Sequence, residues 1–293
     1  MSDRAELPDG LLPGGRIGSW RPAPPRYVAV DVDGTLVGPE PLPTRPVREA
    51  LRALEATGAR VGVATGRMAA SLAPLLESVA LSGPHVFHNG AQVLDGGRTV
   101  ALAGISPQQV DALLGFATTR DDLTVELYTA TSWYTSSLDE RARPHWELLG
   151  GLPVGPLRSS NDLDGPAIKA TFVCFSPQLR EEVGASVREL GLSSGPAGSP
   201  RTPGLVYVNA TAAGVDKSVG IRAVADDLGL GLEQVAAIGD EENDLGVLAV
   251  VGTAIAMGQA DATVRSAAHL VAPSVERDGA AVALSALAAL ERS

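Results

Sequence analysis

Residues 27–37 of this 293-residue chain, YVAVDVDGTLV, give the clearest indication of its fold. The first four residues of this stretch are apolar and partly β-branched, which is typical of a strand buried on both faces inside a parallel sheet. Two acids, Asp31 and Asp33, follow this strand directly. Because a buried carboxylate is costly unless a cation or hydrogen-bond donors compensate it, the stretch predicts a metal-assisted site rather than an ordinary turn.

Strand-like and helix-like segments alternate after this stretch. They are a helix between the caps Thr44 and Gly58, a strand at 59–64, a helix at 69–80 and a strand at 85–88. This βαβαβ order predicts an α/β fold, a doubly wound, Rossmann-like parallel sheet with right-handed crossovers.

The rhythm of the sequence changes near residue 92. Hairpin-like segments and returning helices continue to about residue 208 and predict an inserted α+β unit with an antiparallel sheet. The parallel rhythm then returns with a helix from Lys217 and a strand at 235–238. The predicted organisation is a flexible leader at 1–26, a core domain from 27–91 and 209–293, and a cap domain at 92–208.

Composition excludes several classes of function. The net charge of −11 argues against binding to nucleic acid or to an anionic membrane surface. The single cysteine, Cys174, excludes an intrachain disulfide and a thiolate zinc cluster. No apolar run approaches the ~20 residues that span a bilayer, and the first 26 residues lack the apolar segment of a signal peptide. We therefore expect a cytoplasmic protein without a nucleic-acid or membrane partner.

Polar signatures follow the expected strands of the core. They are Asp31–Asp33, Thr65–Arg67, Asn89–Gly90 and Gly239–Asp244. Ligands bind beyond the carboxyl ends of the strands in open α/β sheets, so these groups should converge at one edge. An anionic substrate would need local positive charge there, which a divalent metal, a lysine or helix N-termini could supply.

These motifs resemble those of the haloacid dehalogenase superfamily, and specifically its Cof-type sugar-phosphatase branch (subfamily IIB). DVDGTLV resembles the first motif, ATGR the second, DKS the lysine motif and GDEENDLGVL the acidic fourth motif. HNGA, AMGQA and RDGAAVAL also resemble segments typical of the branch. The matches span residues 27 to 284, and the insertion resembles the α/β cap of that branch (type C2B). Ser218 follows the lysine where the branch usually has glycine.

The resemblance implies a Mg²⁺-dependent phosphomonoester hydrolase with an aspartyl-phosphate intermediate. Asp31 would be the nucleophile and Asp33 the general acid and base, while Thr65 and Lys217 would complete the catalytic group. Asp31, the backbone carbonyl of Asp33, and Asp240 would hold the Mg²⁺.

The resemblance also implies the supporting residues and the substrate class. Substrate or phosphate contacts would come from Gly34, Gly66, Arg67, Asn89 and Asn243. Asp244 would orient metal-bound waters or Lys217 without binding the metal itself. The cap would close over a small phosphorylated metabolite, either a sugar phosphate or a phosphorylated cofactor.

Two alternatives stay open: a phosphomutase of the same fold, and a non-catalytic member that senses a ligand. The chain would be a monomer or a homodimer.

Overall fold

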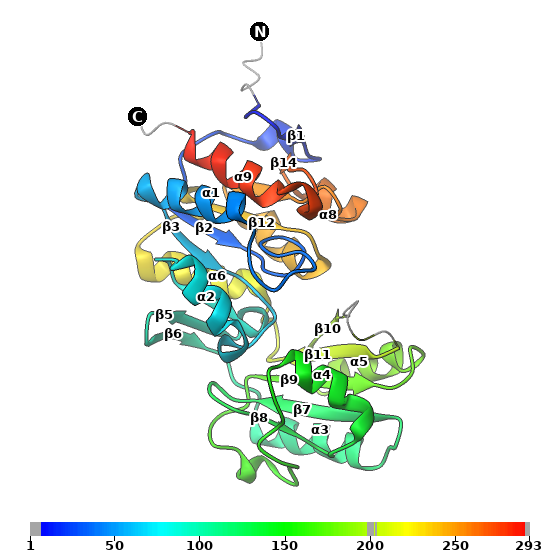
Figure 1. Ribbon diagram of the computed structural model, residues 1–293. Helices are drawn as coiled ribbons and strands as arrows, with labels where there is room; N and C mark the ends of the chain where they lie inside the picture. Colours follow the sequence, from blue (N-terminus) through cyan, green and yellow to red (C-terminus); the bar gives the residue numbers. More distant parts are fainter. Residues whose placement is uncertain (1–6, 198–201, 203, 291–293) are drawn as a thin grey trace. The chain divides into compact units, whose positions relative to one another are not determined.

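The computed structural model describes residues 7–197, 202 and 204–290 of the chain. The chain divides into two compact units, which Figure 1 shows. Unit 1 combines Met1–Ala101 with Lys217–Ser293, and unit 2 is the inserted segment Leu102–Asp216. Both boundaries lie about ten residues later than the sequence predicts.

Unit 1 is built on a largely parallel sheet. In the part of the chain that the structure describes, its strands follow the order β1 (Leu12–Pro13), β14 (Leu270–Val271), β13 (Thr253–Ala256), β12 (Val235–Gly239), β2 (Tyr27–Val30) and β3 (Arg60–Val63). β2 lies between β12 and β3 and pairs with both in parallel. The strand that ends in the two acids is therefore central, as predicted.

Helices cover both faces of this sheet. α1 (Arg45–Ala56), α2 (Ala73–Val79) and α9 (Gly279–Ala288) pack on the face that receives Val28 and Val30. α6 (Lys217–Leu228), α7 (Leu245–Val250) and α8 (Ala262–Ala267) pack on the opposite face, against Tyr27 and Ala29. The doubly wound α/β fold predicted from the sequence is confirmed.

The N-cap of α1 is the residue that the sequence indicates, whereas the C-cap is Thr57, one residue before the predicted Gly58. The Thr44 hydroxyl accepts a hydrogen bond from the Val47 N–H at 3.5 Å. Gly58 follows the helix with a φ of +84°, a conformation that glycine adopts without steric cost. The helix buries Val47, Ala50, Leu51 and Leu54, which follow the spacing i, i+3, i+4 and i+7 of a single helix face.

A small antiparallel sheet completes unit 1. β5 (Gln92–Asp95) and β6 (Arg98–Leu102) form the hairpin expected near Asp95, and β5 pairs with β4 (His85–Phe87). The change of sequence rhythm near residue 92 predicts that this hairpin belongs to the cap. The structure instead includes most of it in unit 1, because its backbone hydrogen bonds go to β4.

The N-terminal segment differs from the expected flexible leader. Residues 1–6 of that leader lie outside the described residues. After them, β1 pairs with β14, and the buried Trp20 donates its indole N–H to the Thr253 hydroxyl at 3.1 Å. Arg16 binds the carbonyl oxygens of Leu248 and Ala267. Proline and glycine suggested flexibility, but these long-range contacts hold residues 12–20 on the sheet edge.

Unit 2 is the α+β unit that the sequence predicts. Its described strands form an antiparallel sheet in the order β10 (Ser193–Ala197), β11 (Val206–Thr211), β9 (Lys169–Cys174), β7 (Leu123–Tyr128) and β8 (Trp133–Thr135). α3 (Pro107–Thr118) and α5 (Leu179–Glu189) bury their apolar faces against it. The capping box of Ser106 and Gln109 begins α3.

The other face of this sheet carries a buried carboxylate, Glu126. It accepts hydrogen bonds from the Tyr128 hydroxyl at 2.6 Å and from the Trp146 indole N–H at 3.1 Å. Trp146 belongs to α4 (Arg143–Leu148), so this polar contact ties α4 to the sheet. Among the residues that the structure describes, no helix is long and apolar enough to cross a membrane.

A buried histidine in unit 1 predicts a loss of stability in acid. His269 accepts a hydrogen bond from the Ala254 N–H on its Nδ1, and burial lowers its pKa to about 4. Since the unfolded chain binds the proton near the ordinary value of 6.5, stability is lost as the pH falls from about 6.5 to about 4. We expect this residue to account for about 2 kcal/mol of the stability lost between pH 7 and pH 5.

The variant His269→Asn tests this prediction. Asparagine offers an acceptor at a similar position but does not titrate in this range. Urea unfolding at pH 7 and pH 5 should show a smaller pH dependence for the variant than for the unchanged protein. Equal losses of unfolding free energy in the two proteins would contradict the assignment.

Candidate active site

A buried ion pair lies at the carboxyl end of β2. Asp31 is the first residue after the strand, and its N–H continues the ladder by donating to the Ile238 carbonyl at 2.9 Å. Lys217, the first residue of α6, is 1% exposed and places its Nζ 2.6 Å from Asp31 Oδ1. Two residues that are 186 positions apart in the sequence therefore meet at the sheet edge.

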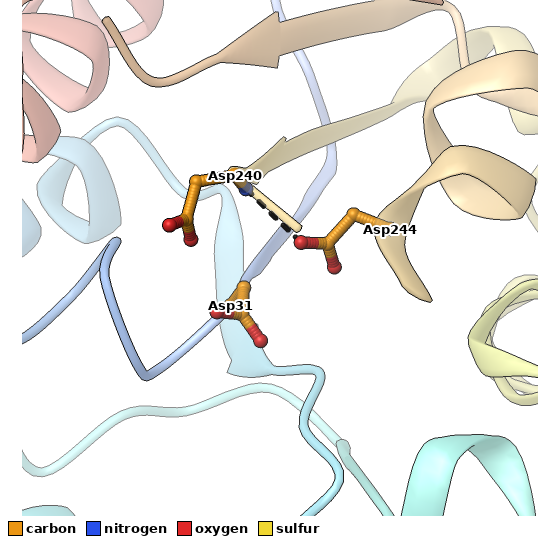
Figure 2. A group of neighbouring side chains, drawn as sticks. All are labelled: Asp31, Asp240 and Asp244. Carbon is orange, nitrogen blue, oxygen red and sulfur yellow. Dashed lines mark hydrogen bonds between the residues drawn. The ribbon is translucent and has the colours of Figure 1, made fainter. Parts of the chain in front are cut away.

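Asp244 is the second partner of Lys217. Its Oδ1 accepts from Lys217 Nζ at 2.7 Å. Its Oδ2 accepts from the backbone N–H groups of Asp240 and Glu241, at 3.0 and 3.2 Å. Figure 2 shows the first of these backbone contacts as a dashed line. Because both oxygens of Asp244 are occupied, this side chain holds the lysine and the 240–241 turn in place.

Asp240 approaches from the loop after β12. Its Oδ1 accepts from the Thr35 hydroxyl at 2.8 Å, and its Oδ2 accepts from the Gln259 amide at 3.1 Å. Figure 2 shows Asp240, Asp31 and Asp244 around one small region. One carboxylate oxygen from each of the three lies within 4.8 Å of the others.

This oxygen group suits a hard divalent cation. Carboxylates are the ligands that Mg²⁺ accepts, and the buried negative charges exceed the single Lys217 ammonium. Asp244 Oδ1 contacts the Lys217 ammonium and its Oδ2 accepts from two backbone N–H groups, whereas each Asp240 oxygen accepts from one neutral donor. Asp31 and Asp240 are therefore the better candidates for direct ligands.

The pKa shifts of these side chains show that burial disfavours their charged forms. Burial raises the pKa of Asp31 well above its ordinary value, although the Lys217 ammonium opposes the shift. Burial also raises the pKa of Asp240, against the hydrogen bond from Thr35. Burial alone would lower the pKa of Lys217, but Asp244 and Asp31 raise it above its usual range. The lysine is therefore charged, and a further cation would favour ionised carboxylates.

Gly34 allows the two acidic loops to approach each other. Its φ is +83°, and a Cβ added there would lie 2.2 Å from Asp240 Oδ2. Any other residue would thus push Asp240 away and strain the backbone. The turn closes with hydrogen bonds from Leu36 N–H to the Asp31 carbonyl and from Gly34 N–H to the Val37 carbonyl.

Asp33 lies outside the acidic group formed by Asp31, Asp240 and Asp244. Its carboxylate is half-exposed and accepts two hydrogen bonds from the Arg67 guanidinium, one of them from Nε at 2.8 Å. Exposed ion pairs contribute little to stability, so this one can open at small cost. Asp33 is therefore next to the site with a side chain that can be redirected.

The remaining predicted residues gather around the loops after β3 and β4. The Thr65 hydroxyl accepts from the Arg67 N–H, and the Thr65 carbonyl accepts from the Asn89 N–H. A Cβ on Gly66 would lie 2.9 Å from Asn89 Oδ1, so the two loops are in close contact. Asn243 donates to Asn89 Oδ1 at 3.5 Å.

The structure thus assembles the predicted residues in two groups. Contacts join Asp31, Lys217, Asp240, Asp244 and Gly34 in the first, and Thr65, Gly66, Arg67, Asn89 and Asn243 in the second. Asp33 connects to the second through Arg67. Thr35 and Gln259 were not predicted as site residues, although they lie in the DVDGTLV and AMGQA segments and both donate hydrogen bonds to Asp240.

Comparison with known sequences identifies the family of the chain. A model of the haloacid dehalogenase-like hydrolase family matches residues 28–284. The 5-amino-6-(5-phospho-D-ribitylamino)uracil phosphatase YcsE of Bacillus subtilis is 26% identical over 263 residues, covering 88% of this chain and 94% of that protein. The pyridoxal phosphate phosphatase YbhA of Escherichia coli is 26% identical over 261 residues, covering 84% of this chain and 92% of that protein.

Solved structures show the same fold. The HAD subclass IIB sugar phosphatase BT4131 superimposes with a TM-score of 0.75 at 23% identity, covering 88% of this chain and 97% of the other. BT1666 of Bacteroides thetaiotaomicron, a phosphatase of the same superfamily, gives a TM-score of 0.75 at 24% identity and covers 98% of this chain and 99% of the other.

Proposed function

The chain belongs to the haloacid dehalogenase-like hydrolase family, and we propose that it is a Mg²⁺-dependent phosphatase of small phosphorylated metabolites. The observation that carries the proposal is the contact of Lys217 with both Asp31 and Asp244, beside Asp240. A nucleophilic carboxylate, a fixed ammonium and a set of cation ligands are the groups that phosphoryl transfer requires.

Asp31 is the proposed nucleophile. One of its carboxylate oxygens attacks phosphorus, and the bond from phosphorus to the substrate oxygen breaks, which forms an aspartyl-phosphate. Asp33 gives its proton to the leaving oxygen. Asp33 then takes a proton from water as that water attacks phosphorus, which releases inorganic phosphate and restores Asp31. For this role the Asp33 side chain must either break its hydrogen bonds with Arg67 or move together with the Arg67 guanidinium.

The other side chains hold charge and orientation. Lys217 keeps a positive charge against Asp31, and Asp244 prevents the lysine from moving. The Thr65 hydroxyl accepts from Arg67 N–H and can donate its own proton to a phosphate oxygen. Mg²⁺ held by Asp31 and Asp240, together with the Asp33 carbonyl, would neutralise the repulsion between the nucleophile and a phosphate dianion.

The proposed substrate is a small phosphorylated metabolite, either a sugar phosphate or a phosphorylated cofactor. Two relatives that align with most of this chain are named as phosphatases of a phosphoribityl compound and of pyridoxal phosphate. The net charge of −11 would repel an anionic substrate, so binding requires local positive charge at the site. The proposed Mg²⁺ and Lys217 supply that charge. The predicted cytoplasmic location and the monomer or homodimer state stay predictions.

Metal removal tests the proposal. Treatment with EDTA should abolish release of inorganic phosphate from a panel of phosphorylated metabolites, and added Mg²⁺ should restore it. Ca²⁺ serves as the comparison, because it prefers more ligands and longer bonds and should restore much less activity. Phosphatase activity that is indifferent to chelation would contradict the metal-dependent mechanism.

A further inference from the structure

We propose that Gln259 is a positioning residue that orients Asp240 for the cation, an inference that rests on the proposed function. Gln259 lies in the loop between β13 and α8, within the AMGQA segment. Its amide contacts three separate parts of unit 1: the Gly34 carbonyl, the Asp240 carboxylate and the Val275 N–H. The side chain therefore joins the loop that follows Asp31 to the loop that carries Asp240.

The hydrogen-bonding partners determine which way the amide faces. Nε2 lies 2.6 Å from the Gly34 carbonyl oxygen and 3.1 Å from Asp240 Oδ2. A carbonyl and an ionised carboxylate are acceptors only, so the NH₂ group must face them. Oε1 lies 3.0 Å from the Val275 N–H, which can only donate. A reversed amide would oppose like groups at all three contacts.

This arrangement fixes the direction of the Asp240 carboxylate. Thr35 holds its Oδ1 and Gln259 holds its Oδ2, so the carboxylate plane is set by two donors from different loops. Each carboxylate oxygen can still accept a second partner, which leaves both able to contact a cation. Outer partners of this kind orient metal ligands, and their loss commonly weakens metal binding about 10- to 100-fold.

Gln259 is suited to a test because it is exposed and outside the apolar core. The variant Gln259→Met keeps a side chain of similar length and removes all three amide contacts. Gln108→Met is the matched control, since Gln108 is exposed on α3 of unit 2. Titration calorimetry with MgCl₂ and no substrate measures cation affinity of the full-length protein directly, and thermal unfolding with and without Mg²⁺ gives a second readout.

We expect Gln259→Met to bind Mg²⁺ about tenfold more weakly than the unchanged protein and to be stabilised less by it. Its activity should reach the normal kcat at higher Mg²⁺, and the control should match the unchanged protein. Unaltered Mg²⁺ affinity in Gln259→Met would overturn the positioning role while leaving the proposed function standing. An unchanged protein that binds no Mg²⁺ would overturn both. A Gln259→Met variant that unfolds at a markedly lower temperature without Mg²⁺ would show a structural role instead.

Discussion

Replacing Asp31 with asparagine should lower kcat by roughly 10⁴-fold or more, because the amide cannot attack phosphorus as a carboxylate does. The substitution is nearly isosteric, so the Lys217 contact at Asp31 Oδ1 can persist with the amide oxygen as acceptor. Binding of substrate should change much less than turnover. Steady-state release of inorganic phosphate, with protein concentration matched, measures the effect.

The control for this variant is Asp226→Asn. Asp226 is exposed on α6, the helix that Lys217 begins, so the same chemical change is made away from the acidic group. It should leave kcat and the free energy of unfolding within experimental error. Appreciable turnover by Asp31→Asn, beyond what contaminating phosphatase explains, would exclude Asp31 as the nucleophile.

Replacing Lys217 with methionine should affect both turnover and stability. The ammonium is buried between Asp31 and Asp244, so its loss leaves two carboxylates without their shared cation. Removing one member of a buried ion pair commonly costs about 3–5 kcal/mol of unfolding free energy. Losing a fixed charge at the reacting group should also reduce kcat by roughly 10²- to 10³-fold. Phosphate release and urea unfolding measure the two effects.

The stability loss in Lys217→Met should depend on pH in a defined direction. Burial already raises the pKa of Asp31, and removing the ammonium that opposes this shift raises it further. Because the folded variant then binds a proton more tightly than the unfolded chain, its deficit should shrink as the pH is lowered from neutral. Arg222→Met, at an exposed position of the same helix, should show no such deficit. A deficit that is constant with pH would contradict the buried-charge explanation.

Much of the fold follows from local signals in the sequence. Thr44 and Gly58 mark the ends of α1, and Lys217 begins the helix that the pattern places there. Local sequence signals do not indicate which strand a hairpin pairs with, so β5 and β6 were predicted to belong to the cap although β5 pairs with β4 of unit 1. The ordered structure of residues 12–20 was not predicted for the same reason, since Trp20 donates a hydrogen bond to a residue 233 positions away.

The site was predictable to the extent that each loop carries its own chemical signature. Asp31, Asp240 and Lys217 each follow or begin an element that the pattern identifies, and strand order brings them together. The orienting contacts were not predictable, because they depend on side-chain reach across loops. Gln259 meets Gly34 over 225 residues, and nothing in the AMGQA segment by itself indicates that partner.

The proposed mechanism requires that the phosphoryl group of the substrate becomes bonded to Asp31 before it is released as inorganic phosphate. The most direct measurement is a single-turnover reaction with enzyme in excess over a phosphorylated substrate, quenched in acid within milliseconds and digested for mass spectrometry. The mechanism predicts a phosphoryl group on the peptide that contains Asp31, formed before inorganic phosphate and absent from the Asp31→Asn variant. Substrate converted to inorganic phosphate with no phosphorylated Asp31 at any time point would contradict it.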